Sequence, residues 1–155
     1  MLSVIDIIKS LSLLVEKNFP NYPVNDRDLQ EGFERPSYFI DVEDVQGENL
    51  TACYVKETAN LSLYFFEEDI YSGFLKLLDM KNKLLELLRE PLALADENGV
   101  IVAHVVFNDV GVTISKADKA LTCTMTSELV QAREDSEKNL PFIESIEIKS
   151  LNLNV

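Results

Sequence analysis

The residues of this sequence that could carry chemistry are one histidine, two cysteines and a few clusters of carboxylates. His104 lies inside the apolar run Val100–Phe107. A histidine that acts as a general base needs a nucleophile or a perturbing partner within hydrogen-bond reach, and the sequence identifies neither. We therefore interpret His104 as a satisfied histidine in the core or at an interface.

The two cysteines, Cys53 and Cys123, are far apart in the sequence, and neither belongs to a Cys-x-x-Cys pair. This spacing gives no support to a zinc ribbon or a redox motif. Each cysteine lies in a strand-like stretch, so we expect two buried, reduced thiols. One histidine and two separate cysteines also lack the ligand set of a zinc site. We predict no metal site and no cofactor.

Carboxylates cluster at Asp26-Arg27-Asp28 and at Glu67-Glu68-Asp69. Neither cluster has the glycine and the final glutamate of a calcium-binding loop, so we interpret both as solvated charges at element boundaries. The chain has five glycines and no glycine-rich phosphate loop. No groove-lining aromatic residues accompany the acids, as a glycosidase would need, and tryptophan is absent. We predict no catalytic residues and no enzyme activity.

The composition favours one globular domain. A chain of 155 residues has the length of an ordinary domain, so we expect a single domain over residues 1–155. Hydrophobic residues make up 46% of the chain, which is enough for a core without disulfides or metals.

The charge balance argues against nucleic acids and membranes as binding partners. The chain carries 27 acidic and 14 basic side chains, for a formal net charge of -13. Such a field repels phosphate backbones and anionic lipid surfaces. No apolar run approaches the roughly 20 residues of a membrane span. The N-terminus lacks the basic region and the cleavage site of a signal peptide, so we expect a cytoplasmic protein.

Apolar residues at helical spacing predict two amphipathic helices. The first begins after a capping box formed by Ser3 and Asp6 and ends near Asn18, because Pro20 cannot continue it. The second begins after the acidic residues 67–69, which suit the positive end of a helix dipole, and ends before Pro91.

Alternating apolar and polar residues predict strands on both sides of the second helix. A strand that opens at Pro36 turns at a hairpin loop, Gln46–Asn49, into a returning strand that ends at Phe66. In the last third, a hairpin turn at Asn98-Gly99 leads into a central strand, Val100–Phe107. Turns at 108–109 and 117–119 then bound strands at 110–115 and 120–129. A polar loop at 136–139 and a tail strand within 143–151 follow. These segments predict an α+β fold. Its sheet is mostly antiparallel or mixed, with both helices packed on one face.

One ordered set of segments points to a known family. The first helix is followed by Asn18-Phe19-Pro20-Asn21, then by Gln30–Ile40, then by a strand that ends with Leu61–Phe65 and runs into the second helix. In this order, over most of residues 1–95, the chain resembles the small tail terminator proteins of phages and phage-derived elements in Gram-positive bacteria. The most specific part of the resemblance comprises Gln30, Gly32, Phe33, Arg35, Pro36 and Phe39. Their spacing assigns them no chemical role, so we take them as structural.

This resemblance implies a structural protein that caps the growing end of a tail tube, ends its polymerisation and forms the platform of a neck or collar. It also implies a homohexameric ring. The expected partners are further copies of the chain and the tail tube protein, with sheath and neck proteins as further candidates. Assembly would occur in the cytoplasm of the bacterial host, and the protein would then form part of the virion tail or of a phage-tail-like particle. The surplus acids would line the bore, so that DNA slides through without sequence-specific binding.

Two other functions remain open at this point. One is a different neck component, either a tail-completion protein or a head-closure adaptor. The other is a free-standing ligand-binding or regulatory domain. The order of neighbouring genes would distinguish another neck component from a terminator. A protein that stays monomeric and gains no mass when mixed with tail tube protein would be a free-standing domain.

Overall fold

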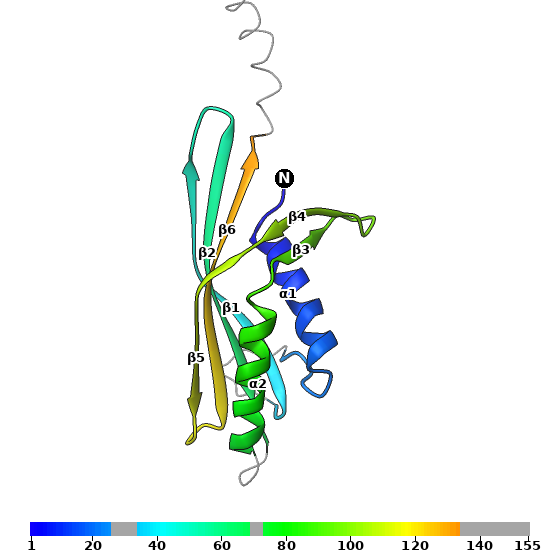
Figure 1. The fold of residues 1–155 in the computed structure, drawn as a ribbon, viewed down its shortest axis with the longest axis vertical. Coiled ribbons are helices and arrows are strands. Elements are labelled where there is room, and N and C mark those ends of the chain that lie inside the picture. Colours follow the sequence, from blue (N-terminus) through cyan, green and yellow to red (C-terminus); the bar gives the residue numbers. More distant parts are fainter. Residues whose placement is uncertain (26–33, 69–72, 134–155) are drawn as a thin grey trace, which may run out of the picture.

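The computed structural model describes residues 1–25, 34–68 and 73–133, and its elements are labelled in Figure 1. In chain order they are α1 (Val4–Asn18), β1 (Ser37–Asn49), β2 (Tyr54–Phe66), α2 (Gly73–Leu87), β3 (Leu92–Ala95), β4 (Ile101–Val105), β5 (Phe107–Ser115) and β6 (Ala120–Ala132). The predicted tail strand within 143–151 and the loop at 136–139 lie outside the described residues.

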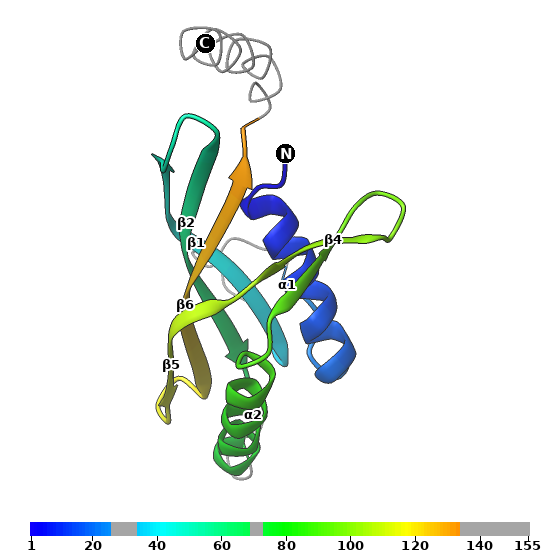
Figure 2. The same ribbon diagram turned by 45° about the horizontal axis from the view of Figure 1, so that its top comes forward.

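The main layer is a four-stranded antiparallel sheet with strand order β1-β2-β6-β5. Strands β3 and β4 form a separate two-stranded antiparallel hairpin. Both helices lie on the same side of the sheet, and no helix of the described residues lies over the opposite face (Figures 1 and 2). The predicted α+β fold, with an antiparallel sheet and two amphipathic helices on one face, is confirmed.

Helix α1 forms as its sequence predicts. The main-chain N–H of Ser3 donates to a carboxylate oxygen of Asp6 at 2.8 Å, which completes the capping box. Three residues at helical spacing face the sheet and are at most 1% exposed: Ile7, Leu11 and Val15. The helix ends at Asn18, before Pro20, because proline cannot donate the hydrogen bond that a further turn needs.

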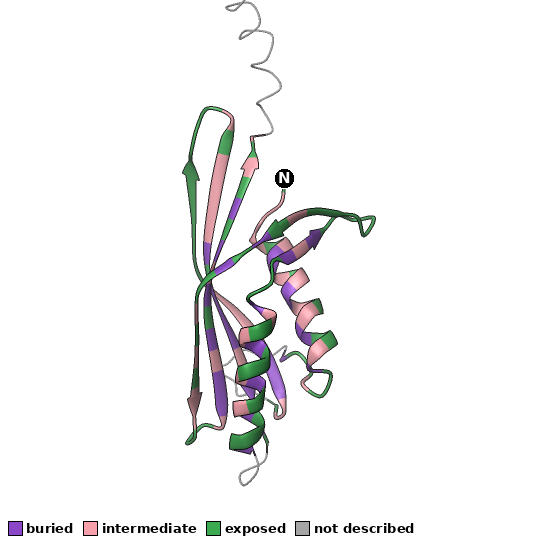
Figure 3. Ribbon diagram, in the orientation of Figure 1, coloured by how far each residue is buried: buried purple, intermediate pink, exposed green. Residues whose placement is uncertain are grey.

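The core lies between the sheet and the helices, where Figure 3 shows the buried residues. The inner face of β2 contributes Leu61, Leu63 and Phe65, each at most 1% exposed, as the alternation predicts. Helix α2 contributes Leu77, Met80 and Leu84. Phe74, in the first turn of α2, is 37% exposed, and the centre of its ring lies 4.6 Å from the ammonium of Lys116.

The predicted hairpin loop at Gln46–Asn49 is wrong. These residues continue β1, and Glu48 pairs with Lys56 of β2. The chain turns later, over residues 50–53, where the hydroxyl oxygen of Thr51 accepts hydrogen bonds from the N–H groups of Cys53 and Tyr54 at 3.1 Å each. The hydroxyl of Thr51 therefore organises the turn, and Gly47 lies within the strand.

The predicted central strand Val100–Phe107 is also wrong. The run divides at Val106: β4 pairs only with β3, and Phe107 begins β5 at the edge of the sheet. Four of its aliphatic residues are between 51% and 58% exposed: Val100, Ile101, Val102 and Val106. The Asn98-Gly99 turn before β4 is confirmed, and Gly99 has the positive φ of 78° that favours glycine.

The turn predicted at Asn108-Asp109 is a bulge within β5. The register between β5 and β6 shifts between Asn108 and Gly111, and Asp109 has a φ of 52°. A bulge of this kind keeps the strand in the sheet while it changes the direction of the chain. The turn predicted at 117–119 is confirmed, with Lys119 at a φ of 50° immediately before β6.

Candidate functional site

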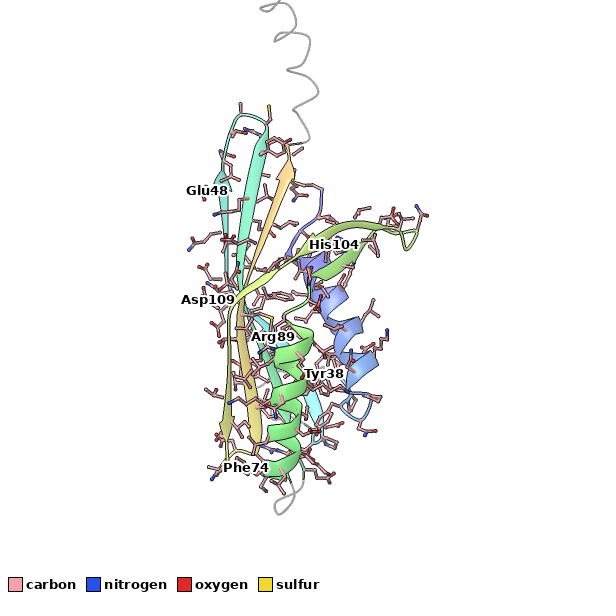
Figure 4. All side chains as sticks on the ribbon, viewed as in Figure 1. Tyr38, Glu48, Phe74, Arg89, His104 and Asp109 are labelled. Carbon is pink, nitrogen blue, oxygen red and sulfur yellow. The ribbon has the colours of Figure 1, made fainter. Side chains whose placement is uncertain are left out.

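His104 lies on the exposed face of β4, so the interpretation as a core histidine is wrong (Figure 4). It pairs with Ala93 across the β3–β4 hairpin. Of its two neighbours in β4, Ala103 is partly buried and Val105 is buried. A role for His104 at an interface stays a prediction.

The two cysteines differ in their surroundings. Cys123 on β6 is fully buried, and this burial raises the pKa of its thiol to about 11. The expectation of a buried, reduced thiol is therefore confirmed for Cys123. Cys53 lies in the turn before β2 and is only partly buried, so the expectations of a strand position and of full burial are wrong for it.

Across residues 1–25, 34–68 and 73–133, the His, Cys, Asp and Glu side chains form no group of three or more that could hold a metal ion. Within the same residues, no helix combines the length and the apolarity that crossing a membrane requires.

Glu67 is not a solvated charge. It is 4% exposed, and its carboxylate accepts hydrogen bonds from the phenol of Tyr22 and from the main-chain N–H of Glu68. Burial, followed by the hydrogen bond and the charge of Glu67, raises the pKa of Tyr22 above its ordinary value. Glu68 is exposed, as predicted, whereas Asp69 and the cluster at 26–28 lie outside the described residues.

Arg35 joins three parts of the chain. Its guanidinium donates to the carbonyl oxygen of Glu67 at 2.8 Å and to that of Asp118 at 2.7 Å, and it lies 5.7 Å from the ring centre of Phe66. These contacts hold the segment before β1 against the end of β2 and the turn between β5 and β6. Arg35 is therefore placed to fix local structure.

The other residues of the family-like segment fall into two groups. Pro36 is partly buried directly before β1, and Phe39 lies on the outer face of β1, with its ring stacked at 6.5 Å on Tyr64. Gln30, Gly32 and Phe33 lie outside the described residues.

The outer face of the four-stranded sheet is polar and acidic. Seven carboxylates lie on its strands: Asp41, Glu43, Asp44, Glu48, Glu57, Asp109 and Glu128. Lys56 is the one basic residue of these strands, and its ammonium lies 3.5 Å from Glu48 and 3.8 Å from Glu128. Figure 4 shows Glu48 and Asp109 on the side of the sheet away from the helices.

Hydrogen bonds hold several polar side chains of this outer face. The hydroxyl of Ser62 donates to the carboxylate of Glu43 at 2.6 Å, at the bulge in β1. The hydroxyl of Thr126 donates to the side-chain oxygen of Asn60 at 2.9 Å. Glu57 is the exception among the seven acids, because it pairs with Leu129 and has the orientation of the inner residues of β2.

The charge of the sheet is not shared by the helices. Helix α1 carries two acidic and two basic residues, and α2 carries two acidic and three basic residues. The four strands of the sheet, by contrast, carry seven acidic residues and one basic residue. The surplus negative charge of the described elements is therefore concentrated on the sheet.

A groove of about 620 Å³ lies between α1 and α2, next to β3. Its apolar lining is Leu13, Leu14, Leu87, Leu88, Pro91, Leu92, Ala93, Ala95 and Phe107, and its polar lining is Ser10, Lys17, Lys83, Glu86 and Glu90. Leu13 is 67% exposed although it is aliphatic. Together with the exposed aliphatic residues of β4, this groove places accessible apolar side chains on the helix side of the molecule.

Within the described residues, β1 and β5 are the edge strands of the sheet. On β1 the described residues include one further pairing, an isolated parallel bridge between Val24 and Tyr38. Free strand edges can pair with another chain. The described residues thus offer three kinds of assembly surface: two sheet edges, an acidic sheet face, and an apolar groove with a protruding hairpin.

The comparisons with known proteins agree with a role in assembly. A family model described as phage tail terminator protein matches residues 6–139. None of the curated proteins that were searched matches the chain. The resemblance found in the sequence is confirmed over a longer part of the chain than its first 95 residues. This protein therefore belongs to the phage tail terminator family, a family of structural proteins of phage tails.

Proposed function

We propose that the protein caps the end of the tail tube, ends its polymerisation and forms the platform of the neck or collar. It acts as a homohexameric ring that contacts the tail tube protein on one side and neck or sheath proteins on others. Assembly takes place in the host cytoplasm, before the ring becomes part of the virion tail or of a phage-tail-like particle. Family membership supports the tail role.

The ring proposal rests on one observation: the helix layer and the sheet layer of the subunit differ in charge. The helices are close to neutral, whereas the sheet has an excess of acidic residues on strands whose outer face is covered by neither α1 nor α2. In a ring with the helices outside, this outer sheet face lines the bore. Each phosphate that a basic residue neutralises adds affinity through counterion release, so an acidic bore avoids retention of DNA.

The two edge strands of the described sheet fit the same arrangement. Strands β1 and β5 lie at opposite sides of the sheet and face neighbouring copies when the sheet lines a bore. A contact between two different surfaces of identical subunits repeats head to tail, and it closes into a ring when the rotation between subunits allows it.

The test combines the purified protein with polymerising tail tube protein. Light scattering measures the mass of the complex, and electron microscopy measures tube length and the location of the protein. We expect a ring at one tube end and shorter tubes as the amount of the protein rises. Tube protein alone is the control.

Two outcomes would contradict the proposal. A protein that stays monomeric and leaves tube growth unchanged is not a terminator. A protein that binds only finished tubes, without any effect on the length of growing ones, is a neck adaptor instead.

A further inference from the structure

We propose that the β3–β4 hairpin of one copy inserts into the groove between α1 and α2 of the next copy. This inference rests on the ring of the proposed function and names one of the contacts that hold it together. It commits to a second copy of this chain as the occupant of the groove.

The base of the β3–β4 hairpin is buried in the core, and its turn is accessible. Leu94 and Val105 are fully buried in the core, so the base of the hairpin is fixed to the rest of the fold. Beyond this base the hairpin projects away from the sheet, past α1 (Figures 1 and 2). Val100, Ile101 and Val102, in and after the turn, are 51% to 58% exposed. Exposed aliphatic residues on a protruding, anchored hairpin are typical of a surface that another protein covers.

The groove offers a matching apolar surface. Its volume is about 620 Å³. Leu13 and Leu87 contribute from the two helices, and Ala93 contributes from β3. The small side chain of Ala93 leaves room beside the leucines. Burial of aliphatic residues from both partners therefore provides the main driving force for the contact.

The charges at the two surfaces are complementary. The hairpin turn carries Asp96 and Glu97, and the sequence has no lysine or arginine between Pro91 and Val106. On the groove, Lys17 belongs to the last turn of α1, and the ammonium of Lys83 donates to the carbonyl oxygen of Asn18 at 2.8 Å. Both lysines therefore lie at the same end of the groove.

The remaining charges of the groove lie further along the chain. Glu86 and Glu90 follow Lys83 on and after α2, toward the start of β3. An incoming hairpin that directs its acidic turn to the lysine end keeps this turn away from the two glutamates. The charge pattern thus selects one direction of insertion.

A hairpin and groove on different parts of one fold give a head-to-tail contact. Ala93 and Ala95 of β3 line the groove, so the hairpin is a wall of its own groove and its projecting turn is directed elsewhere. The turn of one copy is thus available to the groove of another. Repetition of this contact closes a ring when the rotation per subunit fits, as the proposed function requires.

The first experiment is disulfide crosslinking between two variants that each carry one introduced, accessible cysteine in a Cys53→Ser background, where Cys123 stays buried. Leu13→Cys marks the groove and Ile101→Cys marks the hairpin. The two variants are mixed with tail tube protein under mild oxidation. We expect a crosslinked dimer in the mixture. Its yield should be at least about tenfold above that of a control in which Val130→Cys, an exposed site on β6, replaces Ile101→Cys.

The second experiment is a charge exchange. Glu97→Lys and Lys17→Glu, each alone, should weaken ring formation about two- to fivefold, as expected for a partly exposed ion pair. The double variant should recover most of the loss. Lys17 is chosen because Lys83 already binds Asn18 within its own chain. Recovery in the double variant separates a direct contact from two independent defects.

The outcomes separate this inference from the proposed function. Rings that form on the tube without the Leu13–Ile101 crosslink and without sensitivity to the charge exchange overturn the inference and leave the proposed function intact. A wild-type protein that forms no ring with tube protein overturns both. A crosslink from Leu13→Cys to a cysteine placed at Ile148, or to the tube protein, identifies a different occupant and also overturns the inference.

Discussion

The guanidinium of Arg35 donates a 2.8 Å hydrogen bond to the main-chain carbonyl oxygen of Glu67, and the carboxylate of the same Glu67 accepts a hydrogen bond from Tyr22. Glu67, which follows β2, thus accepts hydrogen bonds from two residues of the region between α1 and β1. Arg35 also donates to the carbonyl oxygen of Asp118 in the turn between β5 and β6. These contacts join the lower ends of the strands that form the outer sheet face, so they fix the shape of the proposed bore wall.

Replacement of Arg35 by alanine should lower the free energy of unfolding by about 1–3 kcal/mol, because two carbonyl oxygens lose a charged donor. Chemical denaturation measures the change. Arg89→Ala is the matched control, since Arg89 is exposed on the helix side (Figure 4) and its removal should cost less than about 0.5 kcal/mol. Equal losses for the two variants would show that the contacts of Arg35 contribute nothing specific.

Replacement of Tyr22 by phenylalanine should destabilise the protein by about 1–2 kcal/mol near neutral pH, because the buried carboxylate of Glu67 loses a donor. The effect should depend on pH. The pKa of Tyr22 is raised in the folded protein, so its contribution is fully present below the ordinary tyrosine pKa of about 10 and is lost as the pH rises toward the higher folded value.

The measurement for Tyr22 is the melting temperature of wild type and Tyr22→Phe from about pH 8 to about pH 11. We expect the difference between the two proteins to narrow above about pH 10. Tyr54→Phe is the control, because Tyr54 is 50% exposed. A difference that stays constant across this range would mean that the phenol proton of Tyr22 is not held by Glu67.

Local patterns predicted the parts of the fold that local interactions determine. The capping box at Ser3 and Asp6, the helix end before Pro20 and the turn at Gly99 each depend on neighbouring residues, and all are confirmed. The alternation of apolar and polar residues in β2 also fits its inner face, where Leu61, Leu63 and Phe65 are buried.

The parts that depend on distant partners could not be predicted. Glu67 is buried because Tyr22, which lies 45 residues earlier, donates to its carboxylate and Arg35 donates to its carbonyl oxygen. The local sequence around Glu67 shows only three acidic residues at a helix start. The apolar run Val100–Phe107 has the composition of a buried strand, and composition does not distinguish a core of the same chain from a surface that a second chain covers.

No pattern in the sequence predicted the groove between the two helices. Leu13 and Leu87 belong to two helices that were expected to pack on the sheet. Leu13 is 67% exposed, and both residues line the groove. A helix pattern shows which residues are apolar, but the separation of two helices in space depends on the whole fold.

The two cysteines should react at very different rates with a thiol-specific alkylating reagent. Cys53 lies in a turn and should be modified within the native protein. Cys123 should react at least about a hundredfold more slowly, because it is fully buried, its pKa is raised to about 11, and modification requires opening of the core. Mass spectrometry over time measures both rates. Cys53→Ser, which should gain a label only in denaturant, is the control, and rapid labelling of that variant would contradict the prediction.

Charge reversal on the outer sheet face should make the assembled ring bind DNA. Asp41→Lys together with Asp44→Lys should raise the affinity of capped tubes for duplex DNA by about tenfold or more and steepen its salt dependence, because the new lysines release counterions from phosphates in the bore. Fluorescence anisotropy at two salt concentrations measures both effects. The matched control, Glu16→Lys on α1 with Asp79→Lys on α2, changes the net charge equally but on the helix side and outside the groove. If the control gains as much affinity as the sheet variant, the sheet does not line the path of the DNA and the orientation of the subunit in the ring must be reversed.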